Sequence, residues 1–356
     1  RIGFRGYTIN DLVSAKDEGA ISLSPTNIID GEINVDKCSY ISWNKYYESP
    51  EIMIFKNDIL IVKTGSSYGR TALVKEVKHQ MTINPQFVVL KNININPIYL
   101  SYYIKSKTFQ NQISSIVVGS AIPTLSQKNL ANLYLKIQGS QTQQEIAGIL
   151  SSLDAKIETN NKLNEKLEEM AQAIFKSWFV DFEPFKDKPF HETELGMIPE
   201  GWEVGSLSDI ATITMGQSPR GTSYNENGEG IIFYQGRTEF GFRFPSVRLY
   251  TTAPSRFAEV GSTLMSVRAP VGDINMALLR CCIGRGVASI KSNCDCDSYI
   301  YYLMKSLKKR FDIYNGEGTV FGSVGRDTLR GLLITIPPSS VISDFVNSLV
   351  IVSVTS

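Results

Sequence analysis

Residues 144–185 read QEIAGILSSLDAKIETNNKLNEKLEEMAQAIFKSWFVDFEPF, and this stretch decides how the chain is organised. Between Ile146 and Trp178, apolar or amide residues recur in alternating steps of four and three, which is an unbroken heptad pattern. The pattern predicts one helix of 33 residues, about 50 Å long at a rise of about 1.5 Å per residue. A helix of this length with one apolar stripe needs a partner helix, so the sequence favours a coiled coil over a helix lying on its own domain.

The polar positions of this stripe fall near its middle. Asn160 and Asn164 cost stability in a coiled coil, but they fix the register and orientation of the helices. The residues predicted to form the helix interface are Ile146, Leu150, Leu153, Ile157, Asn160, Asn164, Leu167, Ala171, Ile174 and Trp178.

The segments on either side of the helix are typical of β-rich domains. Apolar runs bounded by Gly, Asn and Pro predict strands at Ile59–Lys63, Phe87–Lys91, Leu133–Ile137, Ile231–Tyr234, Ser262–Val267 and Leu332–Ile336. Helical spacing predicts helices at Pro97–Ser106 and Asp297–Phe311. We expect an α+β chain with domains at 1–140 and 201–338, a long helix at 141–182, a linker at 183–200 and the start of a second helix at 339–356.

The two globular segments repeat each other. Residues 56–62 match 260–266, residues 96–106 match 296–306, and residues 119–126 match 318–325. Nothing in the first segment corresponds to Ile198–Ile210, which opens the second, and only a short apolar segment follows Pro338. We therefore expect a duplicated domain, each copy followed by a helix, in a chain that is cut at both ends.

The net charge of +1 hides an uneven distribution. Residues 1–140 carry a net charge of +5 and residues 201–337 carry +3, whereas residues 141–200 carry −6. Two mildly basic modules permit phosphate contacts without requiring them. No apolar run reaches the roughly 18 residues that a membrane span needs. The five cysteines are odd in number and clustered late, which indicates a reducing cytoplasm rather than a disulfide framework.

The chain resembles a known family, the specificity subunits of type I restriction–modification systems. The resemblance is carried by Gln144–Glu158 and Leu167–Phe185 in the predicted helix, and by Ile198–Glu203, Ile83–Gln86 and Gly119–Pro123 in the repeated segments. It covers most of the chain, although the opening of the first recognition domain and most of the second conserved helix are missing.

The resemblance implies a fold and a role. Each globular segment would be a target recognition domain that reads one half of a split site in double-stranded DNA, and the two conserved helices would pack antiparallel. Methyltransferase subunits would dock on the helices, and restriction and translocase subunits would join them. The chain would have no cofactor or catalytic residue of its own, and S-adenosylmethionine and ATP with Mg would bind to the partner subunits.

The sequence lacks the usual signatures of catalysis. It has no Gly-x-x-x-x-Gly-Lys-Ser/Thr loop, and His79 and His191 are its only histidines. Asn84–Phe87 is a near miss to the Asn-Pro-Pro-Tyr/Phe loop of DNA methyltransferases, but no glycine-rich turn precedes it. The pairs Cys281-Cys282 and Cys294-x-Cys296 lack the two-residue gap of a zinc site, so we predict no metal.

Three alternatives stay open on the sequence. The chain could serve a methylation-only or other defence complex, it could be a DNA methyltransferase with divergent motifs, or it could be a coiled-coil assembly protein with no role on DNA.

Contacts to DNA need Arg, Lys and small polar donors. In residues 201–337 eleven of the 15 basic residues are arginines, including Arg243, Arg248 and Arg256, which predicts a half-site richer in guanine. For any single arginine, a solvated surface position is the alternative. The residues predicted to contact DNA are Ser66, Ser67, Tyr68, Arg70, Lys128, Arg220, Arg237, Arg268 and Arg326.

Overall fold

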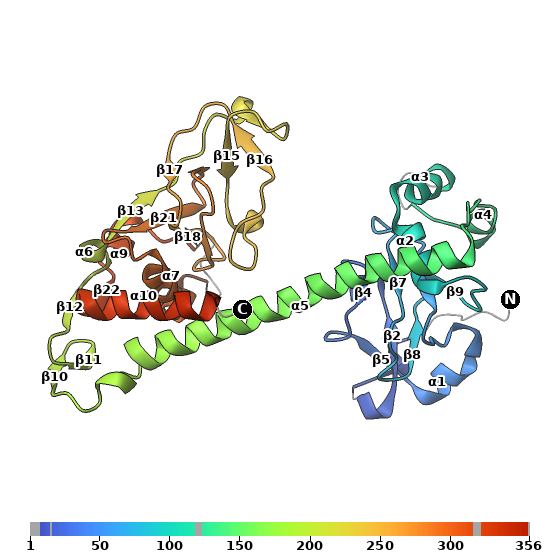
Figure 1. Ribbon diagram of the computed structural model, residues 1–356, viewed down its shortest axis with the longest axis horizontal. Helices are drawn as coiled ribbons and strands as arrows, with labels where there is room; N and C mark the ends of the chain where they lie inside the picture. Colours follow the sequence, from blue (N-terminus) through green and yellow to red (C-terminus); the bar gives the residue numbers. More distant parts are fainter. Residues whose placement is uncertain (1–7, 15, 118–122, 316–321, 355–356) are drawn as a thin grey trace. The chain divides into compact units, whose positions relative to one another are not determined.

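The computed structural model describes residues 8–14, 16–117, 123–315 and 322–354 (Figure 1). It divides the chain into two compact units, Arg1–Asn161 (unit 1) and Lys162–Ser356 (unit 2). The long helix α5 (Ser140–Phe179) contributes its N-terminal half to unit 1 and its C-terminal half to unit 2.

Unit 1 is built on two small sheets. The first has the strand order β1-β5-β2-β8, with β2 and β8 parallel, and the second has the antiparallel order β7-β6-β9. The strands are β1 (Leu12–Val13), β2 (Gly19–Leu23), β3 (Ile28–Ile29), β4 (Glu32–Ile33), β5 (Ser39–Ser42), β6 (Ile59–Val62), β7 (Thr71–Leu73), β8 (Met81–Ile83) and β9 (Phe87–Leu90). The helices before α5 are α1 (Trp43–Glu48), α2 (Pro97–Lys105), α3 (Lys107–Ile116) and α4 (Gln127–Ala131).

Local sequence explains the central elements of unit 1. The strand β6 is the run Ile-Leu-Ile-Val, whose side chains alternate between two cores, Leu60 and Val62 in one and the two isoleucines in the other. A strand buried on both faces needs such a continuous apolar run. The helix α2 begins after Asn96, whose Oδ1 accepts a hydrogen bond from Tyr99 N at 3.0 Å, and Pro97 occupies its first turn.

Unit 2 has a larger set of strands in two main sheets. Their orders are β13-β21-β18-β19 and β14-β16-β15-β20-β17, and β12 pairs with β22. The strands are β10 (Phe190–Thr193), β11 (Gly196–Pro199), β12 (Glu203–Ser206), β13 (Ala211–Met215), β14 (Tyr224–Asn225), β15 (Ile231–Tyr234), β16 (Leu249–Thr251), β17 (Phe257–Ala258), β18 (Thr263–Ser266), β19 (Ile274–Met276), β20 (Cys281–Ile283), β21 (Val287–Ser292) and β22 (Leu333–Ile336). The helices are α6 (Leu207–Ile210), α7 (Asp297–Ser306), α8 (Lys308–Phe311), α9 (Arg326–Arg330) and α10 (Ser339–Val354).

Three strand pairings of unit 1 recur in unit 2, which confirms the predicted duplication. The antiparallel pair β6–β7 of unit 1 corresponds to β18–β19 of unit 2, and the antiparallel pair β6–β9 corresponds to β18–β21. The parallel pair β2–β8 corresponds to the parallel pair β15–β20. In each unit the last of these strands is followed by a helix, α2 in unit 1 and α7 in unit 2. The fold is therefore an α+β fold with one β-rich domain repeated.

Three expectations about local structure need correction. The predicted strand at Leu133–Ile137 is wrong, because this segment is not a strand in the structure. Its counterpart in unit 2, β22, pairs with β12, whereas the described residues of unit 1 contain no strand equivalent to β12 that could pair with it. The predicted helix Asp297–Phe311 is broken at Leu307 into α7 and α8. The segment expected as a linker contains the hairpin β10–β11.

In unit 2 the helix α10 lies beside the C-terminal half of α5 (Figure 1). The ring of Phe345 lies 5.7 Å from that of Phe175 and 5.1 Å from that of Phe179. Leu349 is one turn later than Phe345 in α10, and Leu167 is about three turns earlier than Phe179 in α5. These two leucines line the same cavity. Later residues of one helix thus approach earlier residues of the other, which confirms the antiparallel packing of the two helices.

Candidate nucleic-acid interface

Strand ends of unit 2 meet at the loop Gly284–Gly286, between β20 and β21. Gly284 N donates to Tyr234 O at the end of β15 (2.8 Å), and Gly286 O accepts from Val267 N after β18 (3.0 Å). The end of β13 joins them, because Gly216 N donates to the carbonyl oxygen of Val287 (2.9 Å). We name this place the unit 2 junction, and its loops are 216–220, 235–237, 267–272 and 284–286.

Glycine is required at the unit 2 junction because the backbones approach each other so closely. A Cβ atom on Gly216 would lie 2.2 Å from the carbonyl oxygen of Gly284, and one on Gly286 would lie 2.9 Å from that of Gln235. Contacts this short force a backbone shift, so no other residue fits without moving a strand end. The junction is therefore a tightly packed support from which the neighbouring side chains project.

Unit 1 repeats two of the hydrogen bonds of this junction, with different side chains. Asn84 N donates to Leu23 O at 2.9 Å, and Gln86 O accepts from Lys63 N at 2.7 Å, in the pattern of unit 2. These bonds match Asn84, Pro85 and Gln86 of unit 1 to Gly284, Arg285 and Gly286 of unit 2. The isolated β-bridges of Thr64 and Arg268 match these two residues to each other. The two junctions thus share a backbone, but only the second carries arginine at these positions.

The unit 1 residues that we predicted to contact DNA lie in two places. In the loop between β6 and β7, Ser66 and Arg70 are exposed, whereas Ser67 and Tyr68 are partly buried and Tyr68 packs against the core. Tyr68 and Arg70 also line a cavity of about 650 Å³. Lys128 is exposed on α4, which begins after the segment that bridges to this loop.

The unit 2 junction brings several of the predicted residues together. Arg220 and Arg268 are exposed on its loops. Arg326 is the first residue of α9, directly after the segment that bridges to Arg268. Arg237 is also at the junction, but its Nε pairs with an Asp273 oxygen at 3.0 Å, so part of its charge is compensated.

Ion pairs occupy other arginines of unit 2. Arg243 pairs with Glu168 at 2.9 Å and Arg248 pairs with Glu239 at 2.6 Å, so both contribute less free charge than the composition indicated. Sequence reasoning missed Arg285, which is exposed at the tip of the loop between β20 and β21. The glycines on both sides of it were the available signal, because they mark a close approach of the backbone.

The structure places the predicted stripe of α5 in different surroundings along its length. Leu153 and Ile157 are 54% and 58% exposed, and Asn160 and Asn164 are exposed as well, so no described residue covers the middle of the stripe. Toward the two ends the side chains are partly or fully buried, namely Ile146, Leu150, Leu167, Ala171, Ile174 and Trp178. The stripe is therefore packed only at its ends.

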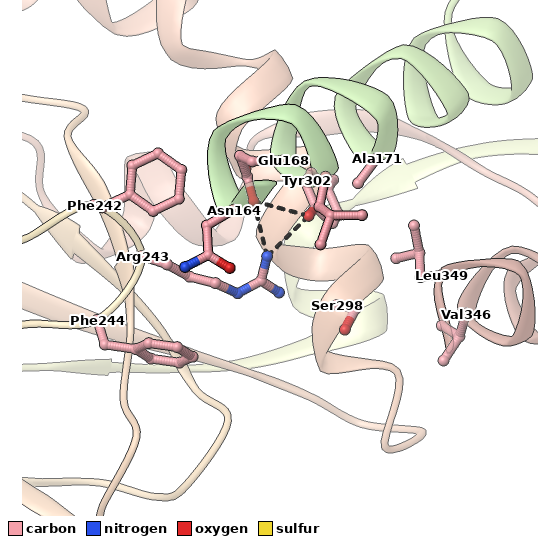
Figure 2. Close-up of a pocket in the computed structure, with 11 residues that line it drawn as sticks. Asn164, Glu168, Ala171, Phe242, Arg243, Phe244, Ser298, Tyr302, Val346 and Leu349 are labelled. Carbon is pink, nitrogen blue, oxygen red and sulfur yellow. Dashed lines mark hydrogen bonds and ion pairs between the residues drawn. The ribbon is translucent and has the colours of Figure 1, made fainter. Parts of the chain in front are cut away.

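Beside the stripe, the buried Glu168 ties α5 to the rest of unit 2 (Figure 2). Its carboxylate accepts hydrogen bonds from Arg243 Nη1 (2.9 Å), Tyr302 OH (3.0 Å) and Lys305 Nζ (2.6 Å). Burial raises the pKa of Glu168, but the hydrogen bond and charge of Lys305 and the charge of Arg243 outweigh burial and lower it. We name these four residues the Glu168 cluster, and it borders a cavity of about 510 Å³. A glutamate off the apolar stripe gave no sign of this role.

In unit 1 a tyrosine makes the corresponding attachment to α5. Tyr102, the repeat counterpart of Tyr302, donates its hydroxyl hydrogen to Asp154 Oδ2 at 2.6 Å. Burial raises the pKa of Tyr102, and the hydrogen bond to Asp154 raises it further. Each unit is thus joined to its part of α5 by a bond between a tyrosine and a carboxylate.

The described residues contain no group of three or more His, Cys, Asp or Glu side chains that could hold a metal ion. Cys281 and Cys282 are buried, whereas Cys294 is exposed.

Asn84 donates its side-chain amide to Gln86 Oε1 at 2.9 Å, and its own Oδ1 accepts from Gln86 N. In the part of the chain that the structure describes, every helix is too short or too polar to cross a bilayer.

The chain matches a family model over most of its length. The model for the type I restriction modification DNA specificity domain matches residues 6–169 and 199–350. The two matches begin at the two repeated segments, which agrees with the duplication.

Curated proteins and a solved structure agree with this family. The chain is 33% identical over 344 residues to a putative type I restriction enzyme MjaX specificity subunit of Methanocaldococcus jannaschii, covering 92% of this chain and 80% of the relative. It is 34% identical over 162 residues to the type I restriction enzyme HindI specificity subunit of Haemophilus influenzae, covering 44% and 35%. The S subunit of a type I restriction–modification system from M. genitalium shares the fold, with a TM-score of 0.55 at 16% identity over 98% of this chain and 89% of that one. The family is defined by DNA recognition and not by catalysis, and the chain belongs to it as a DNA specificity subunit of type I restriction–modification systems.

Proposed function

We propose that the chain selects a split DNA target, with unit 1 reading one half and unit 2 reading the other. The observation that carries this proposal is the repeated junction, in which one pattern of strand ends and hydrogen bonds recurs with two sets of side chains. Phosphate contacts fix the register of a protein on DNA, and side chains that reach base edges read the sequence. Two readers with one backbone and different side chains are suited to two different half-sites.

We also infer that methyltransferase subunits dock on the helices and that restriction and translocase subunits join this assembly. The half-exposed Leu153 and Ile157 on α5 support a protein partner at this helix, because large apolar side chains in a row are costly in water. The partner subunits would hold S-adenosylmethionine and ATP with Mg. The free cysteines among the described residues fit a cytoplasmic location.

The test is methylation-sensitive sequencing of DNA treated with the chain and its cognate methyltransferase subunits. We expect one motif with two fixed halves separated by an unspecified spacer. Gln86→Ala in unit 1 and Arg237→Ala in unit 2 should each affect a different half. An unsplit motif would contradict the proposal.

Two further measurements separate the alternatives. Methyl transfer by the purified chain alone would support a divergent methyltransferase instead. Methylation without cleavage, after the restriction subunit and ATP are added, would identify a methylation-only complex.

A further inference from the structure

Unit 2 carries four arginines around one loop, and the segments that bear them are in direct contact. Ile283 N donates to Arg256 O at 2.9 Å, and Arg285 N donates to Ser218 Oγ at 3.3 Å, two residues before Arg220. Arg268 follows Val267, whose N–H bonds to Gly286 beside Arg285. We name Arg220, Arg256, Arg268 and Arg285 the arginine patch.

The charges of the arginine patch are not compensated within the part of the chain that the structure describes. All four side chains belong to exposed residues, and none pairs with a described carboxylate within 4.0 Å. Other arginines of unit 2 differ, since Arg280 pairs with Glu259 at 2.9 Å and lies 4.0 Å over the ring of Phe257. Four unpaired arginines on segments that contact one another give this part of unit 2 a local excess of positive charge, which favours a polyanion over a single carboxylate.

The surroundings of the patch favour phosphate over base edges. An arginine that reads a guanine is held in a planar orientation by packing or by a second hydrogen bond. No described residue holds the guanidinium of Arg256 or Arg285 in this way, whereas a phosphate contact needs only charge within reach. The close backbone approach at Gly284 and Gly286 fixes the loop that carries Arg285.

At the two patch positions that can be matched to described residues of unit 1, unit 1 has no arginine. Pro85 stands where unit 2 has Arg285, and Thr64 stands where unit 2 has Arg268. The electrostatic part of binding should therefore be unequal between the two halves of the target.

We propose that the arginine patch is a phosphate-contact site that holds the DNA backbone beside the half-site of unit 2. Among the described residues of unit 1, Thr64 and Pro85 replace Arg268 and Arg285 of this site. This inference rests on the proposed function, because it assumes that unit 2 binds DNA. It goes further by assigning these four arginines to the sequence-independent part of binding.

The experiment measures the affinity of the complex of the chain with its cognate methyltransferase subunits for two duplexes between about 50 and 200 mM salt. One duplex carries the motif found by sequencing, and the other carries a scrambled unit 2 half-site. Arg285→Ala and Arg256→Ala should each lower the slope of log K against log salt by about 0.9. Each should also lose affinity for both duplexes by the same factor. Between these two salt concentrations, a variant that lacks one phosphate contact should lose about 3.5-fold less affinity than the wild type loses.

Controls keep the result interpretable. Arg280→Ala removes a paired arginine of the same unit and should leave the slope unchanged, while Arg285→Lys keeps the charge and should keep the slope. Retained binding of the methyltransferase subunits shows that each variant is folded.

Two results would overturn the inference. An unchanged slope in Arg285→Ala and Arg256→Ala would remove them from the DNA. A loss confined to the motif-bearing duplex, or an altered methylation motif, would assign them to base reading. If the wild-type complex shows no preference between the duplexes, the proposed function fails, while the salt slopes still test the patch.

Discussion

Replacing Glu168 by alanine should destabilise unit 2 strongly. The side chain is 7% exposed and accepts three hydrogen bonds from the other members of the Glu168 cluster, two of which are cations. Alanine would leave Arg243 and Lys305 close together without their counter-charge. Removing one partner of a buried ion pair costs about 3–5 kcal/mol, and the side chains of these two cations are 27% and 26% exposed, so we expect about 3 kcal/mol.

The assay is thermal unfolding followed by tryptophan fluorescence. Trp178 and Trp202 pack in or against the core of unit 2, and Trp43 lies in unit 1, so a Trp43→Phe background makes the signal report on unit 2. A loss of 1 kcal/mol lowers Tm by about 2–4 °C in a unit of this size, so Glu168→Ala should lower it by about 6–12 °C.

Glu169→Ala is the matched control. Glu169 is the next residue of α5, and it pairs with Lys166 at 2.6 Å on the surface, where both side chains are more than half exposed. Exposed pairs contribute about 0–1 kcal/mol, so this variant should melt within about 2–4 °C of the wild type. If Glu168→Ala also melted in that range, the cluster would not stabilise unit 2 and our reasoning about its burial would be wrong.

Three further outcomes are expected. The pKa of Glu168 is lowered from its ordinary value of 4.5, so the stability that the cluster contributes should be fully present above pH 4.5 and lost as the pH falls through the lowered pKa. Glu168→Gln should flatten this part of the curve of unfolding free energy against pH, and an unchanged curve would contradict the prediction. Tyr102→Phe removes the hydrogen bond to Asp154 and should cost about 1 kcal/mol, seen as faster amide exchange in α2, whereas unchanged exchange would show that the bond contributes nothing. Burial raises the pKa of Cys281 to about 12, so iodoacetamide at about pH 8 should label the exposed Cys294 before Cys281, which mass spectrometry can show. Equal labelling rates for the two cysteines would mean that β20 opens readily.

Much of the fold could be predicted because its signals are local. The run at 59–62 is apolar at every position, and β6 lies there with all four side chains buried. The heptad pattern predicted α5, whose observed bounds are Ser140–Phe179. The strand at Leu133–Ile137 could not be judged locally, because a strand needs a partner and the equivalent of β12 is not among the described residues of unit 1.

The candidate site could be predicted less well. The loops at Thr64 and Arg268 were found because they repeat, and a repeat is visible in the sequence. Arg285 was missed because its neighbours in space come from the ends of β13, β15 and β18, which are distant in the sequence.

The sequence by itself determined that the chain has two repeated β-rich units on one long helix, and that its second unit is rich in arginine. Periodicity, repetition and composition are properties of neighbouring residues, so they need no tertiary information. Only the tertiary structure decided which arginines keep a free charge, since Arg243 is paired by a glutamate 75 positions away and Lys305 by the same glutamate 137 positions away. Charge in a folded protein is available for binding only where no buried partner compensates it, and packing alone sets those partners.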